Sequence, residues 1–218
     1  MHKRTIYISL GLLTATIALS AFVEFGLNPR SQRILPEACR TNCVTPFSQV
    51  LGTAPGNVRA YSNCNAGCVF FSPNTEGGIY TGIKWQCVEF ARRWLLDNMG
   101  VVYGDVDIAS DIWSKIEVVS RVADKHQLSL IAFENGSVEP PKVGDLLIYS
   151  KEYLNTGHVA VITDVDLPTG LLKVAEQNYS NQTWPADYAR QIDVINKNGR
   201  YWVLDAHLLG WKRVAQEH

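Results

Sequence analysis

Cys87 is the residue whose type and position first suggest chemistry in this sequence. It stands near the start of residues 84–100, where apolar residues repeat at helical spacing and Gly100 provides a natural end. A thiol in the first turn of a helix lies near unpaired backbone N–H groups and the positive end of the helix dipole, which favour the thiolate. The pattern makes Cys87 a candidate nucleophile; the alternative is a small residue of the hydrophobic core.

A thiolate nucleophile needs a base to share its proton and a third group to orient that base. The sequence offers both in residues 158–163 and 171–177, which read as two strands joined by a turn around Leu167. His158 is a polar residue on an otherwise apolar strand, and Glu176 lies near the end of the second strand. These two residues are the candidate base and the candidate orienting carboxylate.

The register of this expected hairpin decides whether the two side chains meet. If Asp164 pairs with Gly170, then His158 lies directly opposite Glu176, and the Cβ atoms of such cross-strand neighbours are about 4.5–5.5 Å apart. Asn178 falls on the same face, one step further along. A slip of one residue would turn Glu176 to the opposite face, so the prediction depends on this register.

The remaining periodicity predicts helices first and strands afterwards. Within the first helix, Arg92, Arg93 and Asp97 fall largely on the side away from the apolar face, and a second helix is expected over residues 109–116. Residues 122–141 read as irregular. Strands are expected in the C-terminal half, at residues 146–149, 158–163, 171–177, 201–204 and 208–211. This order predicts an α+β domain with N-terminal helices packed on an antiparallel β-sheet.

The other four cysteines form two CxxxC motifs, Cys39 with Cys43 and Cys64 with Cys68. In an oxidising compartment we expect two disulfides, and three connectivities are open, among them Cys39 to Cys68 with Cys43 to Cys64. A zinc site made by all four is the alternative, because this spacing is tolerable for zinc. Either arrangement would staple the entry to the domain and leave Cys87 as the odd thiol.

Residues 1–27 have the features of an export signal, with a basic start followed by an apolar run over residues 6–23. The run is long for a signal peptide and nearly long enough to span a bilayer, so a cleaved leader and a membrane tether are both open. We expect an exported protein, periplasmic or extracellular. A cysteine-containing extension is expected over residues 28–76 and a catalytic domain over residues 77–218.

The composition excludes several classes of function. The 218 residues carry 20 lysines and arginines against 21 acidic residues, and no basic cluster with interleaved aromatic residues stands out. We therefore expect no nucleic-acid partner. No metal motif and no glycine-rich phosphate loop accompanies the candidate residues, and the proposed chemistry needs no cofactor.

Five motifs in order, WQCVEFARRWL, GDLLIY, TGHVAVIT, VAEQN and LGW, resemble the CHAP family of cysteine, histidine-dependent amidohydrolases and peptidases. Within that family they are most similar to the amidase domains of bifunctional glutathionylspermidine synthetase/amidases. The resemblance covers residues 80–212 and implies a papain-like α+β fold. It assigns the nucleophile, base and orienting carboxylate to Cys87, His158 and Glu176.

The same resemblance implies an oxyanion hole made by the backbone N–H of Cys87 and the side chain of Gln86. Arg92 would bind a substrate carboxylate, with a structural role as the alternative, and Asn178 would contact substrate or support the triad. The implied substrate is a glutathionyl-polyamine or γ-glutamyl-peptide amide. Peptidoglycan is the alternative substrate, and a non-catalytic exported binding module is the alternative function.

Overall fold

The computed structural model describes residues 35–216 of the chain. The expected leader over residues 1–27, with its apolar run at residues 6–23, lies outside the described residues, so its cleavage and its role as a tether remain predictions. Within residues 35–216, no helix combines the length and the hydropathy needed to cross a bilayer.

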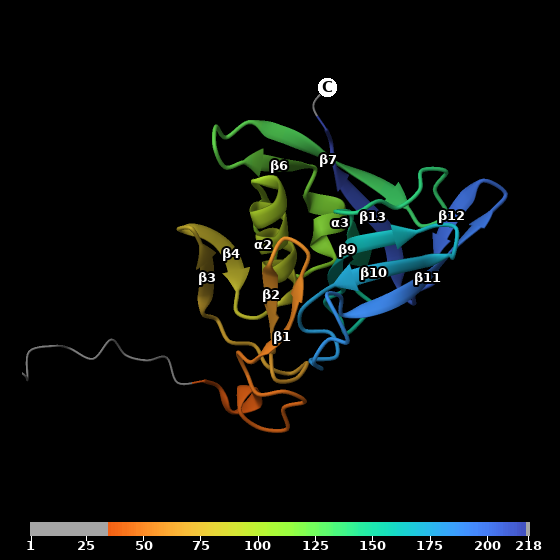
Figure 1. The fold of residues 1–218 in the computed structure, drawn as a ribbon. Helices are drawn as coiled ribbons and strands as arrows, with labels where there is room; N and C mark the ends of the chain where they lie inside the picture. Colours follow the sequence, from red (N-terminus) through yellow and green to blue (C-terminus); the bar gives the residue numbers. More distant parts are fainter. Residues whose placement is uncertain (1–34, 217–218) are drawn as a thin grey trace, which may run out of the picture. The chain divides into compact units, whose positions relative to one another are not determined.

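A nine-stranded antiparallel sheet dominates the fold (Figure 1). Its strands are β5 (Val101–Tyr103), β6 (Val118–Arg121), β7 (Gln127–Glu134), β8 (Leu146–Tyr149), β9 (His158–Asp166), β10 (Leu171–Ala175), β11 (Arg190–Lys197), β12 (Arg200–Val203) and β13 (Leu208–Val214). Neighbouring strands follow the order β12-β11-β10-β9-β8-β13-β7-β6-β5. The last strand of the chain therefore lies in the middle of the sheet, between β8 and β7.

Helix α2 (Cys87–Met99) packs against β9 and β5 of this sheet. It begins at Cys87 and ends at Gly100, whose φ of 67° is the left-handed conformation that closes a helix without steric cost in glycine. Two hairpins lie on its other sides, β1 (Val50–Ala54) with β2 (Val58–Tyr61) and β3 (Pro73–Glu76) with β4 (Ile79–Ile83) (Figure 1). Helix α2 is consequently buried over most of its length.

The two faces of β9 carry two hydrophobic clusters. Val159 and Val161 pack in the cluster that contains the apolar residues of α2, whereas Ala160 and Ile162 pack in the cluster on the opposite face, around Trp211. This alternation is what a strand buried on both faces requires. By the same alternation His158, the first residue of β9, shares the face of Ala160 and Ile162, where its partner in the ladder is Tyr149.

The expected fold class, an α+β domain with N-terminal helices packed on an antiparallel β-sheet, is wrong. Strands account for 39% of the described residues and helices for 12%. The described residues contain two α-helices, α2 and the short α3 (Asp111–Lys115), which is shorter than the helix expected over residues 109–116. Residues 127–134, expected to be irregular, form β7 because they pair with β13 from the far end of the chain. Pairing over that distance overrides the local sequence pattern.

Two nested disulfides close a disulfide-bonded segment over residues 39–68, which contains the hairpin of β1 and β2. Cys39 is bonded to Cys68 and Cys43 to Cys64, with Cα–Cα distances of 4.7 and 4.2 Å. Because all four sulfurs are in disulfides, the alternative of a zinc site is excluded for them. The short 3-10 helix η1 (Glu37–Cys39) leads into the segment. Two disulfides in one domain fit an oxidising compartment, extracellular or periplasmic.

Candidate active site

Cys87 lines a cleft of about 440 Å³. Its thiol is buried at the first residue of α2, and it is the free cysteine of the described residues. The walls of the cleft come from the disulfide-bonded segment, β4, the start of α2 and the loops at residues 105–109 and 153–158. Of the residues named as candidates from the sequence, Gln86, Cys87, His158 and Asn178 all line this cleft.

His158 and Glu176 form a hydrogen bond that is almost completely shielded from solvent. The distance between His158 Nε2 and Glu176 Oε2 is 2.8 Å, and the two residues are 1% and 3% exposed. His158 begins β9, and Glu176 directly follows β10. With Nε2 occupied by the carboxylate, Nδ1 is the ring nitrogen left for the hydrogen bond with Cys87. The structure thus brings together the three residues that the sequence suggested as nucleophile, base and orienting carboxylate.

The register that was expected for this hairpin is nevertheless wrong. Asp164 pairs with Lys173 instead of Gly170, an offset of three residues. A β-bulge at Thr163 reduces the offset to two, because Ile162 pairs with Val174. An offset of two keeps every side chain on its expected face, whereas an offset of three would turn Glu176 away from His158. The bulge is therefore what allows the predicted contact.

The charges of Cys87 and His158 support each other. Burial raises the pKa of the Cys87 thiol, but the charge of His158 and hydrogen bonds from its ring and from the backbone of Val159 and Val88 bring that pKa below its ordinary value. Burial lowers the pKa of His158, yet Cys87 and Glu176 raise it to about 9. A thiolate and an imidazolium therefore coexist from the lowered pKa of Cys87 up to about pH 9.

Glu176 is ionised in this environment. Burial raises the pKa of its carboxyl group, whereas hydrogen bonds and charges from His158 and Arg190 hold the pKa below its ordinary value. Arg190 Nε donates to Glu176 Oε1 over 2.6 Å. Each oxygen of the carboxylate thus has a cationic partner on a different strand.

Gln86 and Asn178, which both line the cleft, are joined by a hydrogen bond. Asn178 Nδ2 donates to Gln86 Oε1 over 2.9 Å. Gln86 Nε2 makes two long contacts of 3.3 Å, to Asn63 Oδ1 and to the carbonyl of Cys68. The disulfide-bonded segment therefore fixes the side chain that was expected to contribute to the oxyanion hole. Asn178 Oδ1 is buried without a hydrogen-bond partner.

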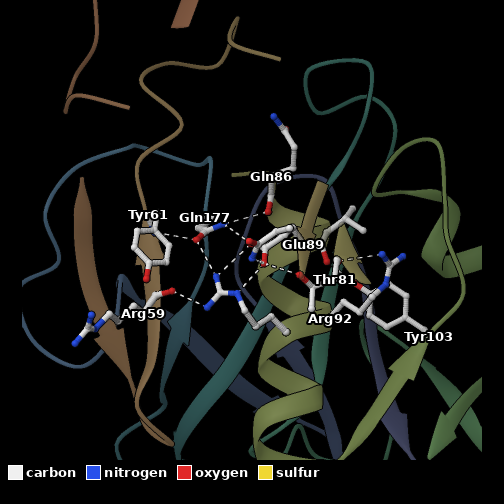
Figure 2. Close-up of polar contacts among 11 residues, drawn as sticks. Arg59, Tyr61, Thr81, Gln86, Glu89, Arg92, Tyr103 and Gln177 are labelled. Carbon is white, nitrogen blue, oxygen red and sulfur yellow. Dashed lines mark hydrogen bonds and ion pairs between the residues drawn. The ribbon is translucent and has the colours of Figure 1, made fainter. Parts of the chain in front are cut away.

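Arg92 does not line the cleft. The side chain is 2% exposed, and its guanidinium donates to the carbonyl of Thr81 (Figure 2). It also donates to the carbonyl of Gly104 and to the carboxylate of Asp105. It also lies over the ring of Tyr103, 4.8 Å from the centroid. This arrangement is the structural alternative that the sequence left open for Arg92. The expectation that this residue and Arg93 face away from the core is wrong, because both are buried.

A buried ion pair anchors the first turns of α2. Glu89 is 0% exposed, and its carboxylate accepts hydrogen bonds from Arg93, four residues on, and from the side chains of Thr81 and Gln177 (Figure 2). Gln177 also accepts from the backbone N–H of Tyr61. Because Gln177 follows Glu176 in the chain, this network ties the helix that carries Cys87 to the segment that carries Glu176.

Several residues around the site were not foreseen from the sequence. Arg190 opens β11, a strand that the sequence pattern did not indicate, and Asp205 follows β12. Tyr153 and Tyr179 stack on each other and both lie against His158, with ring centroids 6.0 and 5.3 Å from the imidazole. No local pattern could identify these residues, because Arg190 reaches the site by strand pairing and the other three lie in connections between strands.

Residues 78–178 match the family model of the CHAP domain. These residues form a CHAP domain. The resemblance inferred from the five motifs is therefore confirmed, and Cys87, His158 and Glu176 all fall within the matched residues.

Three longer relatives are similar to the chain. The bifunctional glutathionylspermidine synthetase/amidase of Escherichia coli K12 is 39% identical over 183 residues, covering 76% of this chain and 29% of the relative. The trypanothione synthetase of Crithidia fasciculata is 37% identical over 161 residues, covering 73% and 24%. The glutathionylspermidine synthase of the same organism is 30% identical over 198 residues, covering 80% and 27%. The chain thus spans less than a third of these relatives.

The charge pairing predicts an unusually acidic thiol at Cys87. Iodoacetamide should alkylate Cys87 rapidly near neutral pH, well below the ordinary thiol pKa of about 8.5. In His158→Ala, loss of the imidazolium leaves burial as the main influence, so the midpoint of the rate profile should rise by roughly 1–3 pH units. Mass spectrometry of the labelled peptide gives the rates. Cys87→Ala is the control for background labelling, and equal profiles for wild type and His158→Ala would contradict the pairing.

Removal of one member of the buried ion pair should destabilise the fold. Arg93→Met leaves the carboxylate of Glu89 buried without its main cationic partner, and we expect a loss of roughly 3–5 kcal/mol in the free energy of unfolding. The double variant Glu89→Gln/Arg93→Met should recover part of the loss. Urea unfolding measures both. Lys115→Met, which breaks the exposed pair of Lys115 with Asp111, is the control and should leave the urea midpoint unchanged.

Proposed function

We propose that this chain is an exported cysteine amidase, in which Cys87, His158 and Glu176 hydrolyse an amide bond through a thioester intermediate. The observation that carries the proposal is the meeting of a thiol of lowered pKa, an imidazole and a buried carboxylate, the first two of which line a cleft within a CHAP domain. The amidase named in the Escherichia coli relative supports the same reaction class.

The reaction proceeds in two steps. The thiolate of Cys87 attacks the amide carbonyl, and the imidazolium of His158 gives a proton to the leaving amine as the C–N bond breaks, which leaves a thioester on Cys87. Neutral His158 then takes a proton from water, the hydroxyl attacks the thioester, and the C–S bond breaks to release the acid. Glu176 keeps the imidazole oriented in both steps.

Charge stabilisation at the carbonyl oxygen comes from the start of α2. The backbone N–H of Cys87 and the side-chain amide of Gln86 are the donors we assign to the oxyanion hole. The long 3.3 Å contacts of Gln86 Nε2 are weak enough to be exchanged for a stronger bond to an oxyanion. Asn178 Oδ1 is buried without a hydrogen-bond partner, and it would accept a hydrogen bond from an N–H of the substrate.

The cleft favours a substrate with a cationic portion, and we propose a glutathionylspermidine-like or γ-glutamyl-peptide amide. Asp105 and Asp107 line the cleft, whereas His158 is the basic side chain among the lining residues that the structure describes. Arg92 offsets part of the charge of Asp105, so Asp107 provides most of the attraction for an ammonium group. The polyamine conjugate in the name of the Escherichia coli relative fits this chemistry.

Peptidoglycan remains the second candidate substrate, since export would suit a wall polymer. Its stem peptides carry carboxylates that the acidic cleft would repel, and for this reason the polyamine conjugate is favoured. A non-catalytic binding module is the third candidate, and it has no use for the lowered pKa of Cys87. Export is supported by the two disulfides, which persist in oxidising compartments.

The assignment predicts amide hydrolysis that depends on Cys87. Purified protein without residues 1–27 should release spermidine from glutathionylspermidine, and Cys87→Ala should reduce the rate by at least about 1,000-fold because the nucleophile is lost. A peptidoglycan digest is assayed in parallel for released amines. Hydrolysis of the digest alone would make the chain a wall hydrolase, and full activity in Cys87→Ala would overturn the mechanism.

The acidic lining predicts a specific change in KM. Asp107→Asn should raise KM for glutathionylspermidine roughly 2- to 5-fold and leave kcat unchanged, because an exposed charge contributes to binding but not to the chemical step. The effect should diminish at high salt. Asp111→Asn, which removes a carboxylate that does not line the cleft, is the matched control. An unchanged KM in Asp107→Asn would refute the role of the acidic lining.

A further inference from the structure

Arg190 lies behind the orienting carboxylate, on the side away from Cys87. Its Nε donates to Glu176 Oε1 over 2.6 Å, while the other oxygen of Glu176 forms the hydrogen bond with His158. Arg190 pairs with Val174 across β10 and β11, two residues before Glu176, so both side chains emerge on the same face. Glu176 is thereby held from both sides.

A second carboxylate balances the charge of Arg190. Arg190 Nη1 donates to Asp205 Oδ2 over 2.6 Å, and Nη2 donates to the hydroxyl of Tyr149 over 3.0 Å. That hydroxyl donates in turn to Asp205 over 2.7 Å. The ring of Tyr179 covers the guanidinium, with its centroid 4.2 Å away. Every edge of the guanidinium therefore has a partner.

The geometry points to Arg190 and Asp205 as a positioning pair for Glu176, an inference that rests on the proposed function. Arg190 holds one oxygen of Glu176 in place, so that the other oxygen keeps its hydrogen bond with His158. Asp205 balances part of the positive charge of Arg190, so that the guanidinium does not weaken Glu176 as a hydrogen-bond acceptor. The planar guanidinium suits this role because it can bond three acceptors in fixed directions. Neither residue touches the cleft that holds Cys87.

The groups around His158 define what the pair can influence. Cys87 and Glu176 contact the ring directly, and Tyr149, Tyr153 and Tyr179 lie against it. Arg190 and Asp205 follow as the next charges behind Glu176. The positive guanidinium, if left unbalanced, would draw Glu176 away from the imidazole and would disfavour the imidazolium.

Two variants test the pair through different readouts. Asp205→Asn keeps the shape but removes the balancing charge, so the pKa of His158, measured by NMR titration of its ring signals, should fall by roughly 0.5–1 pH unit. Arg190→Lys keeps the charge but cannot bridge three acceptors, so kcat for glutathionylspermidine should fall roughly 10- to 100-fold with KM unchanged. Circular dichroism establishes that both variants fold.

The matched control is Asp145→Asn. Asp145 makes a two-pronged ion pair with Arg213 at the opposite end of β8, so this variant also leaves an arginine unbalanced but away from His158. The pKa of His158 should not move in this control. An equal pKa of His158 in wild type, Asp205→Asn and Asp145→Asn, or a wild-type kcat in Arg190→Lys, would overturn the positioning role. The NMR titration needs no substrate, so a wild-type protein that hydrolyses neither test substrate would overturn the proposed function alone.

Discussion

The buried hydrogen bond between His158 and Glu176 joins two groups that each cost several kcal/mol to remove from water when charged. Such a pair persists only where further charges compensate it. In this structure, charges alternate in one line, from the thiolate of Cys87 through the imidazolium of His158, the carboxylate of Glu176 and the guanidinium of Arg190 to the carboxylate of Asp205. The thiolate of Cys87 is one end of this line, and the charges of the other four members balance one another.

The β-rich fold explains how such a line of charges is held. β8, β9, β10 and β11 are consecutive neighbours in the sheet. β8 ends at Tyr149, β9 begins at His158, β10 ends one residue before Glu176, and β11 begins at Arg190. The helix that carries Cys87 is fixed to the same edge by Glu89 and Arg93, through Gln177. Helix α2 on one side and the four strands on the other therefore set the geometry of the line of charges.

Prediction from sequence succeeded where the signal was local. The period of residues 84–100 and the glycine that ends them define α2 and place Cys87 at its start. The sequence did not reveal Arg190, because a strand formed by long-range pairing leaves no local pattern. It did not reveal the burial of Arg93 either, because the partner that allows a charge to be buried cannot be recognised from the neighbouring sequence. The contact of His158 with Glu176 was expected correctly on a wrong register.

The bulge at Thr163 has a consequence for natural variation and for engineering of this hairpin. A deletion or insertion of one residue between Thr163 and Glu176 within the paired strands would turn every later side chain of the strand, including that of Glu176, to the opposite face. The turn at residues 167–170 lies beyond the last pair of the ladder, Asp166 with Leu171, and is largely exposed, so changes of length are better tolerated there than in the strands. Length variation that keeps Glu176 facing His158 is therefore expected in the turn, and a one-residue gap within the strands of an alignment marks either a misalignment or a chain in which the two side chains no longer meet.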